Sequence, residues 1–178
     1  MPASESSRPG EIVMALRLED IELIKQLKHR YMRCLDTADP EGLKATMHPD
    51  LTIDYIGGSY HIKADGRDQV MQMLSGMWNK KYAGSHIVHH PEIDVAEDGL
   101  TAEGIWYLTD YALNFNINKS TQGAAIYRDK YVKQDGKWLI RHSGYTRLWE
   151  RYEDFDKKPN LPAHLYATLD LPESQPGG

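Results

Sequence analysis

The sequence predicts a single α+β domain with an antiparallel sheet, because helix-periodic segments fill its first half and strand-like segments fill its second half. Its 178 residues suffice for one hydrophobic core and leave no room for two. We expect residues 11–169 to form this domain. The segments 1–10 and 170–178 lack a periodic apolar pattern, so we expect a flexible N-terminus and a flexible tail.

The first predicted helix covers residues 18–38, where apolar side chains recur every three or four positions. They form one buried stripe of Ile21, Ile24, Leu27, Tyr31 and Leu35. Asp39 is typical of an N-cap and Pro40 of a first helical position. These two residues predict a short second helix that ends before His48.

A hairpin and a third helix complete the first half. Residues 51–56 alternate between apolar and polar, Gly57 and Gly58 form a tight turn, and residues 59–63 return as the second strand. Gly66 then opens the third helix. Its apolar face consists of Val70, Met73, Leu74, Met77 and Trp78.

Four long strands follow, separated by short turn signals rich in Gly, Asp and Asn. They cover residues 85–95, 101–115, 123–134 and 137–152. A sheet of this size that curls around the helices can enclose a pocket. The composition suits such a pocket, because 11 Tyr and 4 Trp stand against 2 Phe, and Tyr and Trp can form hydrogen bonds.

Composition also excludes several classes of protein. The 21 basic and 26 acidic residues give a net charge of −5, and no basic stripe suits a nucleic acid. No apolar run fits a membrane span or a signal peptide, so we expect no membrane partner. Cys34 is the only cysteine, which excludes an intramolecular disulfide and favours a cytoplasmic location.

Polar residues in apolar surroundings are the candidates for function. Tyr31 lies on the buried stripe, as either a core tyrosine or a hydrogen-bond donor to a ligand. Asp36 lies at the end of the same helix, where the helix dipole disfavours a negative charge; a solvated capping role is the alternative. Strand alternation places His86 and His89 on opposite faces, which argues against a metal site. Because imidazole is the commonest acid and base in catalysis, an acid–base histidine is the better functional interpretation, and a surface histidine is the alternative.

The strand 101–115 carries a carboxylate on its apolar face. Trp106, Leu108 and Asp110 alternate to the same side, and a buried Asp needs a partner. Arg147 on the last strand can form this ion pair, which is either functional or structural. Gly144 could mark a bulge that changes the face of Arg147.

Taken together, these segments resemble the SnoaL-like branch of the nuclear transport factor superfamily, and within it the bile acid 7α-dehydratases. The similar stretches lie in 31–36, 86–93, 101–110 and 127–147, within a region that covers residues 21–152. The resemblance implies a cystatin-like α+β cone around a deep pocket. It also implies a homo-oligomer, a trimer or a dimer, with no metal and no organic cofactor.

The resemblance implies a catalytic set of one Tyr, two Asp, one His and one Arg. Matched segment by segment, these are Tyr31, Asp36, His86, Asp110 and Arg147. Alternation instead places His89 on the face of Ile87, Ile93 and Val95, so His89 stays a pocket candidate. The candidate substrate-binding residues are His89, Tyr55, Trp106 and Tyr145.

The predicted function is a cofactor-independent lyase that eliminates water from a bulky, hydrophobic hydroxylated substrate, as in steroid or aromatic catabolism. Asp36 would orient His86, which moves the proton, while Tyr31 would stabilise the developing negative charge. One alternative is a diarylpropane γ-formaldehyde lyase acting on a lignin-derived dimer. The other is a binding module without catalysis, since a fold does not determine a function.

Overall fold

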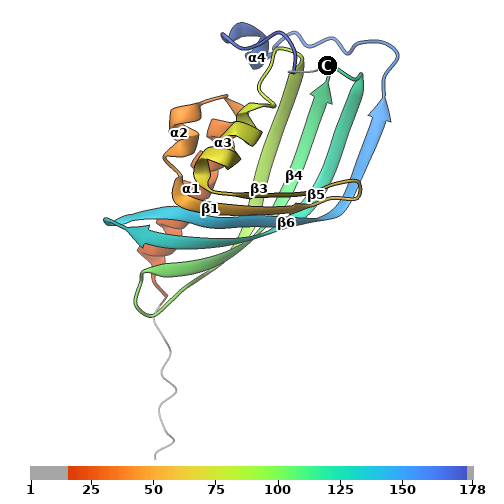
Figure 1. Cartoon of the computed structure of the whole chain (residues 1–178). Coiled ribbons are helices and arrows are strands. Elements are labelled where there is room, and N and C mark those ends of the chain that lie inside the picture. The colour runs from red at the N-terminus through yellow and green to blue at the C-terminus, as the bar shows by residue number, and fades with distance from the viewer. Residues whose placement is uncertain (1–15, 176–178) are drawn as a thin grey trace, which may run out of the picture.

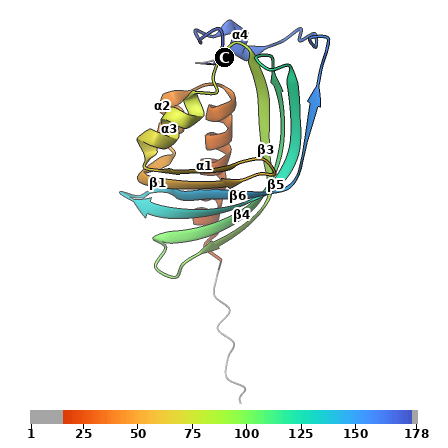
Figure 2. The same ribbon diagram turned by 45° about the vertical axis from the view of Figure 1, so that its right-hand side comes forward.

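The computed structural model describes residues 16–175, so the predicted flexible residues 1–10 and the end of the predicted tail lie outside it. Within this range, helices in the first half of the chain precede and interrupt the strands of a six-stranded sheet. The sheet is strongly curved, and the helices lie against its concave face (Figures 1 and 2). The predicted α+β cone is confirmed.

Helix α1 (Leu18–Asp36) is the longest helix of the described residues and lies along the sheet. Its predicted stripe is buried at Ile24, Leu27, Tyr31 and Leu35. The helix ends at Asp36, two residues earlier than predicted. Because Tyr31 and Asp36 lie in the last turns, the C-terminal end of this helix brings both side chains to the same region of the sheet.

The two shorter helices follow the predicted signals closely. In α2 (Pro40–Lys44) the Asp39 carboxylate accepts a hydrogen bond from the Gly42 N–H at 2.9 Å, as expected for an N-cap. Helix α3 (Arg67–Ser75) ends before Met77 and Trp78, which were predicted to be helical. Trp78 is still buried, since its indole N–H donates to the Leu35 carbonyl at 3.0 Å.

The sheet has the strand order β2-β1-β6-β5-β4-β3. Its strands are β1 (Met47–Ile56), β2 (His61–Asp65), β3 (Tyr82–Val95), β4 (Thr101–Asn114), β5 (Lys119–Gln134) and β6 (Lys137–Asp154). The prediction of antiparallel pairing is right for every neighbouring pair except β1 and β6, which run parallel. The reason is that the chain crosses through α3 to the far edge of the sheet and returns as a meander, whose last strand meets β1.

Register shifts bend the sheet and set which side chains face inward. In β3 the shift falls between His89 and Glu92, and His90 has a positive φ of 50°. In β6 an extra residue, Leu148, lies between the paired residues Arg147 and Trp149. The bulge is therefore not at Gly144, which pairs regularly with Arg128.

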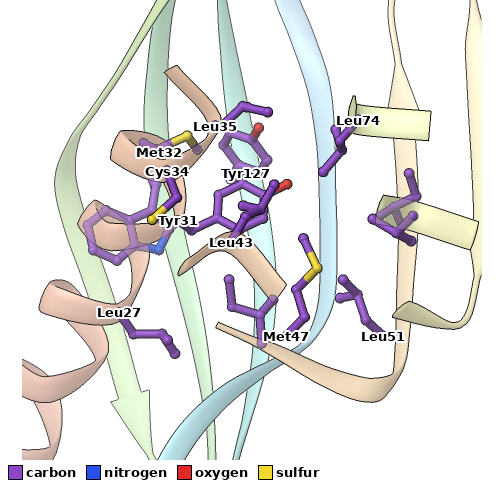
Figure 3. Packing of buried hydrophobic residues seen from close by; sticks show 14 of the residues in the cluster. Leu27, Tyr31, Met32, Cys34, Leu35, Leu43, Met47, Leu51, Leu74 and Tyr127 are labelled. Atoms are coloured by element: carbon purple, nitrogen blue, oxygen red, sulfur yellow. The ribbon is translucent and has the colours of Figure 1, made fainter. Parts of the chain in front are cut away.

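The hydrophobic core lies between α1 and the concave face of the sheet (Figure 3). Side chains from the helices meet those from β1 and β5, including Leu27, Leu35, Met47, Leu51, Leu74 and Tyr127. A buried ion pair lies within this core. The Lys28 Nζ lies 2.7 Å from Asp129 Oδ2 and 3.6 Å from the centre of the Tyr127 ring, and neither charged side chain is exposed.

After β6 the chain crosses the ends of the neighbouring strands to the short helix α4 (Leu165–Thr168) (Figure 1). The hydroxyl of Tyr166 donates to the Leu35 carbonyl at 2.8 Å, and the Lys80 N–H donates to the Pro172 carbonyl at 2.9 Å. Part of the predicted tail thus contacts the loop after α3. No helix among residues 16–175 is long and apolar enough to cross a membrane.

Candidate active site

A cavity of about 360 Å³ lies between the helices and the concave face of the sheet. Its apolar wall includes Leu35, Leu74, Met77 and Leu108. Seven tyrosines also line it, namely Tyr31, Tyr55, Tyr60, Tyr82, Tyr127, Tyr145 and Tyr152. Such a lining combines a large aromatic surface with hydroxyl groups that can orient a ligand.

Asp36 and His86 form a pair at one side of this cavity. The imidazole Nδ1 lies 2.6 Å from Asp36 Oδ1, and the backbone N–H of His86 donates to Asp36 Oδ2 at 2.8 Å. Both side chains are largely buried, with 22% and 19% exposed. The two contacts hold one histidine from two directions, so the carboxylate fixes the position of the ring.

The fold explains why these residues meet although 50 positions separate them. Asp36 ends α1, and His86 lies near the start of β3, the strand that packs against this helix. With Nδ1 bonded to the carboxylate as an N–H donor, Nε2 is left as a proton acceptor. No partner for Nε2 is found among residues 16–175, and His86 lines the cavity.

Asp110 and Arg147 form a two-pronged ion pair next to His86. Asp110 pairs with His86 across β3 and β4, and its two oxygens accept from Arg147 Nη1 at 2.5 Å and Nη2 at 2.7 Å. Burial works to lower the pKa of Arg147, but the hydrogen bonds to Asp110 and Tyr60 raise it above its usual value. The guanidinium is therefore a permanent cation at this wall.

Two pairs of tyrosine hydroxyls extend this polar wall. The Tyr60 hydroxyl accepts from Arg147 Nε at 3.0 Å and lies 2.7 Å from the Tyr145 hydroxyl. The Tyr31 and Tyr55 hydroxyls lie 3.2 Å apart, and the Tyr55 ring stacks on that of Tyr145. Burial raises the pKa of Tyr31 well above its usual value, so its phenol stays protonated at neutral pH and can donate a hydrogen bond.

The structure brings the predicted catalytic set to one cavity. Tyr31, His86, Asp110 and Arg147 line it, and Asp36 reaches it through His86. The predicted substrate-binding residues divide into two groups. Tyr55 and Tyr145 line the cavity with stacked rings whose centres are 4.4 Å apart.

His89 and Trp106 do not line the cavity, so these two candidates are corrected. The His89 Nε2 lies 3.3 Å from Thr109 Oγ1, and its ring stacks on Tyr107, on the face of β3 that points away from the cavity. Strand alternation grouped His89 with the inward-facing Ile93, because it did not include the bulge between His89 and Glu92 that moves Ile93 to the inner face. Trp106 is fully buried deeper in the core, with its N–H bonded to Tyr131 at 2.9 Å.

Sequence reasoning missed several residues at this site. Tyr60 follows the Gly57-Gly58 turn and Tyr82 begins β3, at positions where no periodic pattern assigns a face. Glu150 lies on β6 beyond the bulge at Leu148, so simple alternation gives it the wrong side. Tyr127 could have been found by strand alternation, because it lies on the same face of β5 as Ala125. It pairs with Trp106 on β4.

The described residues do not form a metal site. Among residues 16–175, no group of three or more His, Cys, Asp or Glu side chains is arranged to hold a metal ion. The chemistry that these residues can perform by themselves is proton transfer by His86, next to hydrogen-bond donors that can stabilise an oxygen.

Comparison with known families agrees with this picture. The family model described as the SnoaL-like domain matches residues 16–144, which is most of the chain. The match includes four of the five predicted catalytic residues and ends before Arg147. The resemblance to the SnoaL-like family is thereby confirmed, whereas the narrower one to bile acid 7α-dehydratase stays a prediction.

Solved structures share the fold at low sequence identity. A putative scytalone dehydratase from Novosphingobium aromaticivorans is 21% identical, with a TM-score of 0.67 over 79% of this chain and 91% of that one. A hexachlorocyclohexane dehydrochlorinase is 16% identical, with a TM-score of 0.69 over 82% and 96%. A cystatin-like protein of unknown function from Nostoc punctiforme is 24% identical, with a TM-score of 0.59 over 84% and 98%.

Proposed function

We propose that this chain, which belongs to the SnoaL-like domain family, is a lyase that removes water from a bulky hydrophobic alcohol without a cofactor. The observation that carries the proposal is the Asp36–His86 pair inside a cavity lined by tyrosines. Two of the structural neighbours have names that describe the loss of water or of hydrogen chloride. Elimination is the reaction type that these two names share.

In this mechanism His86 is the base. Asp36 holds the Nδ1–H and stabilises the imidazolium that forms, while Nε2 takes a proton from the carbon next to the one that bears the hydroxyl. The electron pair of that C–H bond forms the new double bond, and the C–O bond breaks. The departing hydroxyl takes a proton from the imidazolium and leaves as water, which returns His86 to its starting state.

The other residues stabilise charge and orient the substrate. The Tyr31 hydroxyl, next to that of Tyr55, donates to the substrate oxygen on which negative charge develops. Since both oxygens of Asp110 are bonded to Arg147, we assign Asp110 to holding the guanidinium rather than to proton transfer. Arg147 in turn orients the Tyr60 hydroxyl at the cavity wall.

The test is turnover of a panel of hydroxylated steroids and aromatic alcohols, with loss of water followed by mass spectrometry. We expect activity on at least one neutral member of the panel and a loss of about 10²–10⁴-fold in His86→Ala. The matched control is His89→Ala, on the other face of the same strand, which should keep its activity. Full activity in His86→Ala would remove the assignment.

The tyrosine-rich lining also favours a second reaction, in which a lignin-derived diarylpropane loses hydroxyl and then formaldehyde. Incubation with a phenolic diol dimer separates the two functions, because only this second reaction releases formaldehyde. A ligand that binds unchanged, with no turnover across both panels, would instead indicate a binding module.

We further propose that the protein is a homo-oligomer, a trimer or a dimer, in the cytoplasm. Large apolar side chains are exposed on the outer face of the sheet, among them Ile87 at 59%, Tyr107 at 41% and Trp149 at 50%. Such exposed apolar surface favours association. Light scattering coupled to size-exclusion chromatography measures the mass, and a monomer at all concentrations would contradict this proposal.

A further inference from the structure

Glu150 is a buried carboxylate that the proposed mechanism does not use. Its side chain is 9% exposed, and its Oε2 lies 3.6 Å from Arg147 Nε. Its Oε1 accepts from the backbone N–H of Gly58 at 2.6 Å, in the turn between β1 and β2. The Tyr152 hydroxyl donates to Oε2 at 3.2 Å. These contacts hold the carboxylate beside the guanidinium that faces the cavity.

Arg147 is therefore shared by two carboxylates. Asp110 accepts from both terminal nitrogens, whereas Glu150 lies beside Nε, which donates to the Tyr60 hydroxyl. The side chains of the three charged residues are only 9–11% exposed, so water screens their charges poorly. One positive and two negative charges leave an excess of one negative charge at this wall.

The other charged groups around the cavity do not offset this excess. Asp36 places a further carboxylate against His86 on the same side of the cavity. Lys119 lines the cavity, but its ammonium lies 2.5 Å from Asp154 and is neutralised there. An anionic group that entered would lose its hydration and meet no unmatched cation among the described residues.

We propose that Glu150 is a specificity-determining residue, which makes the cavity selective for uncharged hydroxylated ligands and excludes carboxylates. The inference rests on the proposed function, because it assumes that the substrate occupies this cavity. Because Asp110 and Glu150 balance the positive charge of Arg147, its guanidinium does not anchor an anion. It positions the hydroxyls of Tyr60 and Tyr145, which form hydrogen bonds with neutral oxygen atoms.

The experiment compares two probes that share one ring system, 2-naphthol and 2-naphthoate, by calorimetric titration at neutral pH. Naphthol is neutral and naphthoate is anionic under these conditions. We expect the wild type to bind naphthol at least about ten-fold more tightly. In Glu150→Gln the amide oxygen can still accept from Gly58, so naphthol affinity should stay the same while naphthoate affinity rises by about ten-fold.

The matched control is Glu153→Gln, on the same strand but exposed and paired with Arg151. It should leave the preference unchanged. Equal binding of the two probes by the wild type, binding of neither, or a preference unaffected by Glu150→Gln would each overturn the inference. The wild-type comparison needs no variant, so it stands even if Glu150→Gln folds poorly.

The outcome is separable from that of the proposed function. If neutral probes bind selectively but no alcohol is turned over, the charge selectivity stands and the lyase proposal fails. If neutral alcohols are dehydrated while naphthoate binds as tightly as naphthol, the lyase proposal stands and Glu150 has no role in selectivity.

Discussion

Asp36 contacts His86 twice, with one carboxylate oxygen 2.6 Å from the ring Nδ1 and the other 2.8 Å from the backbone nitrogen. A single carboxylate thus fixes both the strand and the imidazole that the strand carries. The double contact joins the end of α1 to β3, so the geometry of the proposed base depends on how the helix packs on the sheet.

Replacement of Asp36 by Asn should lower turnover by about 10²–10⁴-fold. The amide keeps the volume and can still accept from the backbone N–H, but its NH₂ group can donate to Nδ1 and select the wrong tautomer of His86. We expect the free energy of unfolding to change by less than about 1 kcal/mol, because one hydrogen bond is weakened. Steady-state kinetics and urea unfolding measure the two effects.

Asp39→Asn serves as the control, since Asn at an N-cap preserves the hydrogen bond to Gly42 and lies away from His86. A variant Asp36→Asn with unchanged turnover and a large loss of stability would show that Asp36 has a structural role. The proposed base would then lack its orienting group.

Helices with a regular apolar spacing, and polar residues that interrupt an apolar face, could be predicted from the sequence because both depend on local spacing. The stripe through Tyr31 and the cap at Asp39 are of this kind. The contact between Asp36 and His86 could not be derived in this way, because it depends on how a helix end packs on a strand 50 residues later. It was inferred from family resemblance alone.

Replacement of Gly123 by Ala should separate Arg147 from Asp110. A Cβ atom at this position would lie 2.8 Å from Arg147 Nη1, which is too close for a real contact, and 3.0 Å from the Trp149 carbonyl oxygen, which is tighter than an ordinary contact. The guanidinium must move away from β5, so turnover should fall by about ten-fold or more. A crystal structure of the variant shows whether the ion pair is lost.

Ala124→Ser is the control, because this neighbouring residue pairs with Thr109 and lies on the outer face of β5. It should leave turnover unchanged. If the Gly123→Ala structure retained the two-pronged ion pair, the close approach of Arg147 to β5 would not be a requirement of the site.

Bulges explain why strand alternation failed where it mattered. Counting in steps of two places His89 and Ile93 on one face, but the register shift between His89 and Glu92 reverses the inner and outer sides. The extra residue at Leu148 has the same effect on Glu150. Such shifts depend on backbone geometry across two strands, which one sequence does not encode in its local pattern.

The buried pair of Lys28 and Asp129 gives a prediction about stability. Lys28→Met should lower the free energy of unfolding by about 3–5 kcal/mol, because it leaves a carboxylate buried without its cation. The double variant Lys28→Met/Asp129→Asn should recover most of this loss, since neither side chain is then charged and the Asn amide oxygen can still accept from the Tyr131 hydroxyl. Urea unfolding followed by circular dichroism measures both.

Lys133→Met is a matched control, because Lys133 also forms an ion pair with an Asp. Lys133 pairs with Asp20 at 2.8 Å, but its side chain is 28% exposed, so we expect a loss of only about 1 kcal/mol or less. A double variant as unstable as Lys28→Met would mean that packing around Lys28, rather than charge, dominates this part of the core.

The last prediction concerns stability at alkaline pH. Burial, followed by the nearby carboxylates of Asp110 and Asp36, raises the pKa of Tyr82 from 10.0 to about 12. Above about pH 10 the unfolded tyrosine loses its proton while the folded one keeps it, so the unfolded state binds fewer protons. The contribution of Tyr82 to stability is therefore full below pH 10 and is lost as pH rises toward 12.

Tyr82→Phe removes this contribution and leaves the other titrating groups in place. The difference in the free energy of unfolding between wild type and variant should shift by about 1 kcal/mol against the wild type between about pH 8 and about pH 11. Lys28 acts with the opposite sign, because burial lowers its pKa and its unfolded form binds the extra proton. That effect is common to both proteins and cancels in the difference. Urea unfolding at several pH values measures the shift, and parallel stability curves for the two proteins would contradict the burial of the Tyr82 hydroxyl.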